Sequence, residues 1–525
     1  MPFKLINSAS TSPIWNASSM QGSPVSTSAV VAGQVLTYNG TTWQGISATP
    51  VQTVSVPSQA LDPNTTFSIL QPTSYSTNYT LGSPTGTYNT KTIILNGNNN
   101  VNILCVPGTI NLTPDTPSAS LVFNGNQWIR YGVSSTTYNW LVSIQQGSKL
   151  VATGYNGASS QGNGVSISGD GSSLAVGGYT DSGNVGVAWI FSATGATGWK
   201  QTQKLVGTGY TGTPEQGVSL TLSTDNTTLA VGGINDNGGV GAVWMFANNS
   251  GNWGQQGVKL VPSDVSGNAS VGVSIALSSN GNISAIGGYT DDSNVGATWI
   301  YSRSGTGWSQ SGTKIVGTGY SGSSYQGCSV ALSNDGSTLA IGGYGDDSNI
   351  GAVWIYYGTG LNYTYQAKLV GSDGVGSSSQ GASVALSSDG NTVAFGGISD
   401  DSGVGAVWVF NRQGTVWTQG NKLVGSGYVG ASQQGYSLSM SGDGNTLCVG
   451  GAYDNSALGA MWVYTRTGIN WTQQGSKLVG TGYSGGAPGA NVFQGVSSSL
   501  TTSGNKLVVG GSGDNSSVGA VWTFI

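Results

Sequence analysis

Side chains able to carry acid–base or nucleophilic chemistry are scarce in this chain of 525 residues. It contains no histidine, and Glu215 is its only glutamate. A Ser-His-Asp or Cys-His triad, a histidine-ligated metal and a histidine general base are therefore excluded. The three cysteines, Cys105, Cys328 and Cys448, form neither a C-x-x-C pair nor a disulfide framework. We expect Cys328 and Cys448 to be buried thiols.

One aspartate recurs at a fixed place in the pattern D-[DNS]-x-x-x-G-A. Seven such carboxylates on one face could bind cations or sugar hydroxyls. Alternatively, each could order its own loop as an Asx-type turn. Presence in every copy favours the structural interpretation, because binding sites usually use a few asymmetric positions. The series is Asp181, Asp236, Asp291, Asp346, Asp400, Asp454 and Asp514.

A second acid occupies a short turn in five copies, at Asp170, Asp225, Asp335, Asp389 and Asp443; the turn reads S-x-D-G, with Asn226 in place of the glycine after Asp225. Asn280 and Ser503 replace it in the other two. One carboxylate in a tight turn cannot supply the six to eight oxygen ligands of Ca²⁺. We therefore expect no metal in this turn, and no cofactor elsewhere in the chain.

These acids belong to a repeat with a period of 54–60 residues. Each copy contains a lysine inside K-[LI]-V, a Gly-Gly pair and a tryptophan. We expect the lysine stem to lie along apolar surface with its amine in water, and the tryptophan to belong to the core. The lysines are Lys149, Lys204, Lys259, Lys314, Lys368, Lys422 and Lys477. The tryptophans are Trp189, Trp244, Trp299, Trp354, Trp408, Trp462 and Trp522. A second series, also expected in the core, is Trp199, Trp253, Trp308, Trp417 and Trp471.

Each copy contains four short β-branched or alternating segments separated by Gly, Asn, Asp and Ser, which is typical of strands and turns. Seven four-stranded units predict an all-β fold, a seven-bladed β-propeller over 140–525. The first copy opens with a fourth-strand segment, 140–151, whereas the last stops at Ile525 after its third strand. We expect the 140–151 segment to complete the last blade and close the ring.

The copies resemble the short-loop branch of the FG-GAP repeats, the family that includes the integrin α-subunit propellers. The resemblance covers 140–525 and includes S-V-A-L-S-x-D-G, T-L-A-I-G-G and D-D-S-x-x-G-A-V-W-I-Y in the fourth copy. Two features depart from the family pattern. Gln-Gly, as at Gln326-Gly327, replaces Phe-Gly, and Gly-Gly followed by Tyr, Ile, Ala or Ser replaces Gly-Ala-Pro.

The strand order places the loops between strands two and three on the same face as the blade-to-blade loops. Five blade-to-blade loops carry a tyrosine at one position, and the longer last loop adds Phe493. Such rings beside Asp and Asn suit stacking on a sugar or a protein partner; packing between blades is the alternative. The candidate residues are Tyr155, Tyr210, Tyr320, Tyr428, Tyr483 and Phe493.

The N-terminal region lacks this repeat. We expect an extended arm over 1–32 and a smaller β-rich domain over 33–139. Two segments, 33–45 and 119–132, place Asn-Gly between an apolar strand and a Trp-bearing strand, which predicts hairpins. The region resembles the β-domains of viral fibre and spike proteins. The resemblance implies anchoring to other virion proteins and a homotrimer.

We therefore expect a non-enzymatic structural protein of the virion surface (fibre, spike or capsid decoration) that displays its propeller to a host glycan or protein receptor. The N-terminus lacks the apolar core of a signal peptide, which favours assembly in a cytoplasm. The alternative is an extracellular cell-surface or matrix adhesin, since FG-GAP repeats of this type occur in bacterial and algal surface proteins.

Other functions are disfavoured by the composition. The 15 basic residues never cluster, which disfavours a nucleic-acid partner. No run of about 18 apolar residues predicts membrane insertion. A propeller glycosidase or lyase would need clustered carboxylates in its channel, and the chain offers only repeated aspartates and one glutamate.

Overall fold

The structure is a computed structural model. It describes residues 145–525 apart from 196–197, 360 and 485–490, and within 1–144 only the backbone of short strands. The chain divides into two units, Met1–Tyr138 and Asn139–Ile525, and each is described by itself.

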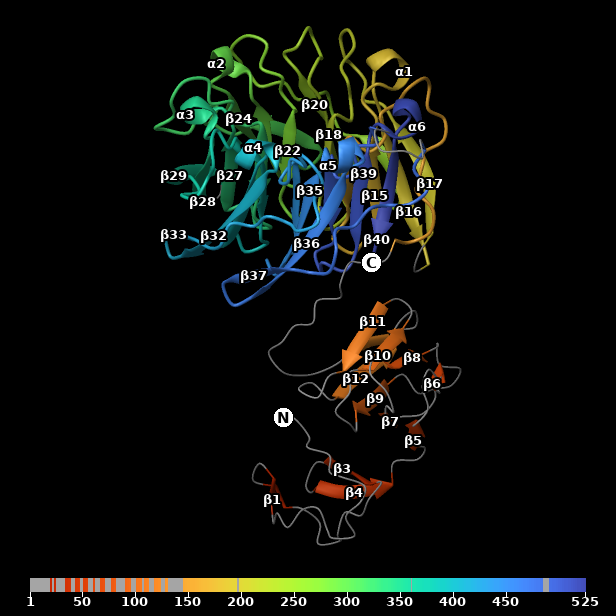
Figure 1. The fold of residues 1–525 in the computed structure, drawn as a ribbon. Coiled ribbons are helices and arrows are strands. Elements are labelled where there is room, and N and C mark those ends of the chain that lie inside the picture. Colours follow the sequence, from red (N-terminus) through yellow and green to blue (C-terminus); the bar gives the residue numbers. More distant parts are fainter. Residues whose placement is uncertain are drawn as a thin grey trace. The chain divides into compact units, whose positions relative to one another are not determined.

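The second unit is a ring of seven antiparallel sheets (Figure 1). Within each sheet the strands lie in chain order, as in β26-β27-β28-β29. The first strand of every blade lies next to the first strands of both neighbouring blades, and β14 of the first blade lies beside β38 of the last. The all-β, seven-bladed propeller predicted from the repeat is confirmed.

The four strands of a blade run from the central channel outward. The first strands are β14 (Val165–Ile167), β18 (Ser219–Leu222), β22 (Ser274–Leu277), β26 (Ser329–Leu332), β30 (Gln380–Leu386), β34 (Ser437–Met440) and β38 (Ser497–Leu500). The second strands are β15 (Ser173–Gly177), β19 (Thr228–Gly233), β23 (Ile283–Gly288), β27 (Thr338–Gly343), β31 (Thr392–Gly397), β35 (Thr446–Gly451) and β39 (Leu507–Gly511). The third are β16 (Ala188–Thr194), β20 (Ala242–Asn249), β24 (Ala297–Ser304), β28 (Ala352–Thr359), β32 (Ala406–Gln413), β36 (Ala460–Thr467) and β40 (Ala520–Phe524). The fourth are β17 (Gly198–Leu205), β21 (Asn252–Gln255), β25 (Gly307–Gln310), β29 (Asn362–Leu369), β33 (Val416–Gln419) and β37 (Asn470–Gln473).

The seventh blade takes its outermost segment from the start of the propeller. Gln145 and Leu150 form antiparallel bridges with Phe524 and Val521 of β40. The Leu150 N–H donates to the Val521 carbonyl over 2.7 Å, and the Val521 N–H donates back over 2.9 Å. Segments from the two ends of the repeat region therefore share one sheet. Residues 140–144 of the expected closing segment lie outside the described residues.

Glycines on both sides of an indole explain why Gly-Gly and Trp recur together. A Cβ on Gly343 would lie 2.7 Å from Cζ3 of Trp354, and one on Gly317 would lie 2.3 Å from its Cδ1. All seven tryptophans of the third strands are fully buried, as predicted. The second series is only partly in the core: Trp253 and Trp471 are buried and the other three are half-buried. The fourth strand packs against its own sheet on one side only, so part of each ring stays open to solvent.

In the first unit, the two expected hairpins are present as strand pairs. β3 (Gln34–Tyr38) pairs antiparallel with β4 (Trp43–Ser47), and β12 (Ser118–Phe123) pairs antiparallel with β13 (Trp128–Arg130). The other strands are β1 (Ser19–Met20), β2 (Ser23–Pro24), β5 (Val51–Val54), β6 (Ala60–Leu61), β7 (Phe67–Leu70), β8 (Thr77–Leu81), β9 (Thr90–Leu95), β10 (Val101–Cys105) and β11 (Gly108–Leu112). The rest of the expected arm and of the 33–139 domain lies outside the described residues, and the trimer stays a prediction.

Candidate functional site

The two ends of the propeller carry different loops. At one end, here called the loop face, the strand two–three loops meet the blade-to-blade loops; at the other, the turn face, lie the S-x-D-G turns and the outer hairpins. The loop face carries short helical turns, which are labelled in Figure 1. These are α1 (Asp181–Asn184), α2 (Asp291–Asn294), α3 (Asp346–Asn349), α4 (Asp400–Gly403), α5 (Asp454–Ala457) and α6 (Asp514–Ser517).

Each of these turns is left-handed after its first aspartate. In α3, Asp347, Ser348 and Asn349 have φ values of 47°, 58° and 69°. Left-handed backbone disfavours most L-residues and is best tolerated by Gly, Asn and Asp. This explains the Asp, Asn, Ser and Gly content of the pattern, although the sequence analysis predicted only an Asx-type turn there.

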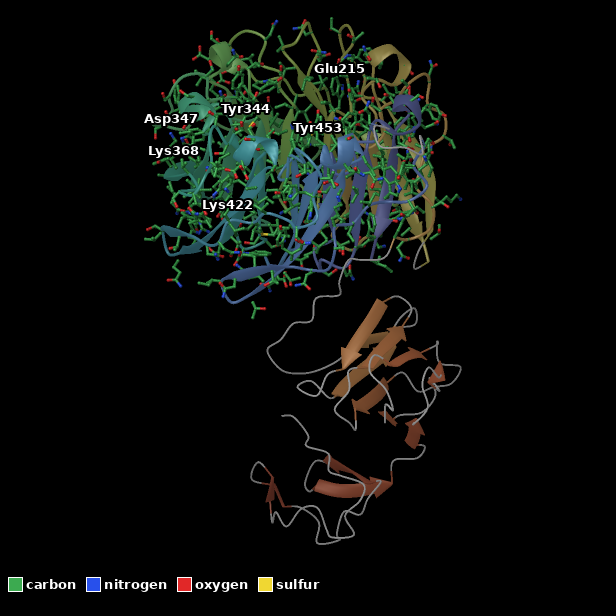
Figure 2. The ribbon with its side chains drawn as sticks, viewed as in Figure 1. Glu215, Tyr344, Asp347, Lys368, Lys422 and Tyr453 are labelled. Carbon is green, nitrogen blue, oxygen red and sulfur yellow. The ribbon has the colours of Figure 1, made fainter. Side chains whose placement is uncertain are left out.

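A buried ion pair joins the recurring aspartate of every blade to the recurring lysine of its outermost segment. Two of these lysines, Lys368 and Lys422, are labelled in Figure 2. In the fourth blade, Asp346 Oδ2 lies 2.6 Å from Lys368 Nζ, and Asp346 Oδ1 accepts the Ser321 N–H over 2.8 Å. The aspartate side chains are at most 1% exposed and the lysines 16–29%. The pairs are Lys149–Asp514, Lys204–Asp181, Lys259–Asp236, Lys314–Asp291, Lys368–Asp346, Lys422–Asp400 and Lys477–Asp454.

The expectation that the lysine amines lie in water is therefore wrong. In a chain with 7% charged residues, a lysine and an aspartate that both recur seven times were the signal for this pairing. Besides the lysine, a backbone N–H occupies the carboxylate in six blades and the Ser182 hydroxyl does so in the first, so these oxygens are not open to a sugar or a cation from solvent.

A buried glutamine holds the end of each fourth-strand segment in six blades. The Gly371 N–H donates to Gln380 Oε1 over 2.5 Å, and Gln380 Nε2 donates to the Gly371 carbonyl over 3.2 Å. In the loop between the second and third blades, Pro262 occupies the glycine position and Val271 the glutamine position. Because proline has no N–H, the donor and its acceptor are lost together. This clamp was not predicted from the sequence, in which the paired exception at Pro262 and Val271 is the signal for it.

The candidate tyrosines lie next to the ion pairs. Tyr155, Tyr210, Tyr320 and Tyr428 are each 39–42% exposed, so neighbouring blades do not enclose them. Tyr483 is half-buried against the core of the seventh blade. Phe493 is also half-buried, and its ring lies edge-on to Tyr453, with 5.4 Å between the centroids. Four of the six predicted residues thus form an exposed ring of similar positions, and two belong to the seventh-blade loop.

On the turn face, the carboxylates accept hydrogen bonds within their own turns. Asp389 Oδ1 accepts from Ser387 Oγ over 2.6 Å and from the Asn391 N–H over 2.9 Å. Burial opposes ionisation, but the bonds from the neighbouring hydroxyl and N–H outweigh it and lower the pKa of Asp170, Asp335 and Asp389.

The same turns are joined into a closed ring of backbone hydrogen bonds. In six blades the second residue of the turn donates its N–H to the carbonyl of its counterpart in the next blade, over 2.8–3.1 Å. In the second blade the donor is Asp225 instead. The donor–acceptor pairs are Gly169–Thr224, Asp225–Ser279, Ser279–Asn334, Asn334–Ser388, Ser388–Gly442, Gly442–Thr502 and Thr502–Gly169. Hydrogen bonds between backbone atoms do not require particular side chains, so this ring of hydrogen bonds could not be predicted from the sequence.

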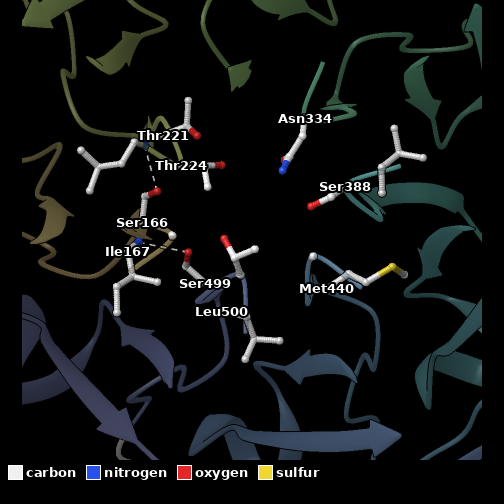
Figure 3. A pocket seen from close by; sticks show the side chains of 14 residues that line it. Ser166, Ile167, Thr221, Thr224, Asn334, Ser388, Met440, Ser499 and Leu500 are labelled. Carbon is white, nitrogen blue, oxygen red and sulfur yellow. Dashed lines mark hydrogen bonds between the residues drawn. The ribbon is translucent and has the colours of Figure 1, made fainter. Parts of the chain in front are cut away.

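A cavity of about 180 Å³ lies inside this ring at the end of the channel (Figure 3). Its polar lining comes from hydroxyl and amide side chains such as Thr224, Asn334 and Ser388, and its apolar lining includes Met440 and Leu500. Two lining serines are occupied: Ser166 Oγ accepts the Leu222 N–H and Ser499 Oγ accepts the Ile167 N–H. The lining has no charged side chain, so this cavity offers neither a general acid nor a general base.

The described residues contain no group of three or more His, Cys, Asp and Glu side chains able to hold a metal ion. Cys448 is fully buried, and Cys328 donates its thiol to the carbonyls of Gly342 and Gly381. Burial raises the pKa of Cys328 to about 11, so the thiol stays protonated and unreactive at neutral pH.

No family model matches the chain, and no curated protein matches it. The propeller therefore stands on its geometry, and membership of the FG-GAP family stays a prediction. Among the described residues, no helix has the length and apolar content needed to cross a membrane.

Proposed function

We propose that the chain is a non-catalytic recognition protein whose loop face contacts a partner. The propeller fold is compatible with a non-enzymatic role in recognition or adhesion. The observation that carries this proposal is a contrast on that face between buried carboxylates, which already have partners within the propeller, and exposed aromatic rings. The seven recurring aspartates are held by lysines, whereas Tyr155, Tyr210, Tyr320 and Tyr428 remain about 40% exposed.

The ring supports such a role mechanically. The turn face is closed by backbone bonds, and every blade is tied to its loop by an ion pair. Loops on a rigid scaffold keep their geometry without a partner, which lowers the entropic cost of binding. The uncharged channel end and the protonated thiols favour recognition over catalysis.

The place of action belongs to the same proposal. We assign the chain to the surface of a virion, with the N-terminal region attached to other virion proteins and the propeller displayed to a host glycan or protein receptor. The support is the fibre-like N-terminal sequence. An extracellular cell-surface or matrix adhesin is the second candidate, favoured by the resemblance of the blades to FG-GAP repeats.

Immunogold labelling of intact particles and cells from the source, with an antibody against the propeller, tests this assignment. Gold on the outside of particles supports the virion proposal. Label confined to cell walls supports the adhesin, and label confined to the cytosol contradicts both.

A further inference from the structure

Opposite charges are distributed unequally between the two faces. Apart from the seven ion pairs, the propeller has five cations, Lys200, Arg303, Arg412, Arg466 and Lys506, and all lie in the turn-face half. The five S-x-D-G aspartates balance them on that face; Arg466, for example, interacts with Asp389 and Asp443. The six remaining carboxylates all lie on the loop face of the second to fifth blades. They are Glu215, Asp264, Asp292, Asp347, Asp373 and Asp401.

The left-handed turns do not require three of these acids. Asp292, Asp347 and Asp401 occupy the second position of the turn and are exposed. The sixth and seventh blades have Asn455 and Asn515 at that position, with the same left-handed backbone. The turn needs a residue that tolerates positive φ, and asparagine serves as well. The negative charge on three consecutive blades is thus additional to what the fold demands.

A tyrosine cluster lies in the same sector, at positions that vary between blades. The rings of Tyr325 and Tyr344 are stacked, 4.9 Å apart at an interplanar angle of 6°, and Tyr289 lies 6.1 Å from Tyr325. All three are half-buried, and no hydrogen bond from their hydroxyls occurs among the described residues. In Figure 2, Tyr344, Asp347 and Glu215 lie in the loop-face half of the propeller.

The fold makes room for Tyr325 by a paired change. In the first and third blades this position is a serine that accepts a bond from a threonine, as in Thr180 Oγ1 to Ser160 Oγ over 3.0 Å. In the fourth blade the threonine is replaced by Gly345, where an added Cβ would lie 2.5 Å from the Tyr325 ring. The same exchange occurs in the seventh blade, where Gly513 faces Phe493. Two coordinated substitutions thus place each ring.

We propose that the loop face of the second to fifth blades docks a basic segment of a partner protein, with a lysine or arginine side chain against the Tyr289–Tyr325–Tyr344 cluster and among Asp292, Asp347 and Asp401. This inference rests on the proposed recognition function and names its partner. Tyrosine faces attract cations, and carboxylates around them add Coulombic attraction and steer the encounter. A neutral glycan would need the rings but not the charge.

The test is titration of the full chain with a fluorescent Lys/Arg-rich peptide and with an acidic peptide of the same length. The triple variant D292N/D347N/D401N removes three charges and copies the turn chemistry of the sixth and seventh blades. The double variant Tyr325→Ser/Gly345→Thr removes the ring at constant charge and copies the first and third blades. Its matched control, Phe493→Ser/Gly513→Thr, makes the same exchange in the seventh blade, away from the acidic sector.

We expect the basic peptide to bind and the acidic peptide not to bind. The charge variant should lose about tenfold in affinity, equal to about 1.4 kcal/mol. The Tyr325 double variant should lose several-fold, and the Phe493 control should bind as the parent chain does. Affinity should fall with added salt, because the Debye length shrinks from about 10 Å at 0.1 M to about 3 Å at 1 M.

Undiminished affinity in the charge variant, or an equal loss in the Phe493 control, would overturn the assignment. So would a neutral oligosaccharide whose binding depends on Tyr325 but not on the three aspartates; that result would leave the recognition function standing. The recognition function itself is lost only if a loop-face antibody fragment does not affect attachment of the source particles or cells.

Discussion

The turn face and the loop face of this propeller are built from the same seven repeats. The residues and hydrogen bonds of the turn face recur from blade to blade more uniformly than the residues of the loop face. On the turn face, charges balance, Asp389 and its counterparts accept bonds within their turns, and backbone bonds run from blade to blade around the channel. On the loop face, the Lys–Asp pairs repeat in all blades, but Tyr325 and Asp347 do not. The comparison teaches that repeated residues hold the ring together, and that residues departing from the repeat are free to contact a partner.

Loss of a buried carboxylate should have the largest effect on stability. Asp346→Ala removes the acceptor of the Ser321 N–H and leaves Lys368 Nζ bonded to the Gly319 carbonyl but without its counter-charge. We expect the free energy of unfolding to fall by about 3 kcal/mol, at the lower end for a broken buried ion pair because the lysine is partly exposed. Urea unfolding followed by tryptophan fluorescence measures this.

Asp347→Asn is the matched control, since Asp347 is the exposed next residue. It should change the unfolding free energy by less than about 0.5 kcal/mol. If the two substitutions lowered the unfolding free energy equally, the claim that repeated positions stabilise the fold and variable positions do not would be wrong.

The glutamine clamp should have the next largest effect. Gln380→Val leaves the buried N–H and carbonyl of Gly371 unsatisfied, so we expect a loss of about 2 kcal/mol in the same unfolding experiment. A loss below about 0.5 kcal/mol would contradict the clamp.

The turn face should respond to acid. Because the folded state lowers the pKa of Asp389, the ionised carboxylate stabilises the fold at pH values above the unfolded pKa of about 4. That contribution disappears as the pH falls through the lowered folded value. Unfolding at pH 7 and at pH 3 should show a smaller loss of stability for Asp389→Asn than for the parent chain. An identical loss in both chains would argue against this carboxylate as a source of acid sensitivity.

The exposed tyrosines should have the smallest effect on stability. Tyr320→Ala removes a ring that is 42% exposed, and we expect a change within about 0.5 kcal/mol. The same thermal or urea unfolding measurement applies. A large loss would place Tyr320 among the residues that hold the blades together and remove it from the contact surface.

The sequence was sufficient for the architecture because the strongest signals were strictly periodic. Trp354 and Gly343 recur together since each glycine makes space for an indole. The seven copies and the phase of the first copy sufficed to predict a closed ring. Tyr155, Tyr210, Tyr320 and Tyr428 are exposed, and their part in binding stays a prediction.

Other features depend on contacts that composition does not encode. The amine of Lys368 was expected in water, because one copy of the repeat does not show which acid faces its lysine; only the sevenfold recurrence of both residues indicates the pair. The left-handed turn and the ring of backbone bonds concern φ angles and main-chain atoms, which many residue types satisfy. The link between Tyr325 and Gly345 cannot be predicted from the sequence, because it depends on the contact between the tyrosine ring and the glycine in the folded chain.

The most direct test of the central claim is inhibition of attachment by antibody fragments. One fragment should be raised against the loop face around Tyr320 and Asp347, and another against the turn face around Asp389. Attachment of the particles or cells that carry the chain is then measured with each. The loop-face fragment should abolish attachment, and the turn-face fragment should leave it intact. Attachment that persists with the loop face covered, or that is blocked only from the turn face, would contradict the account.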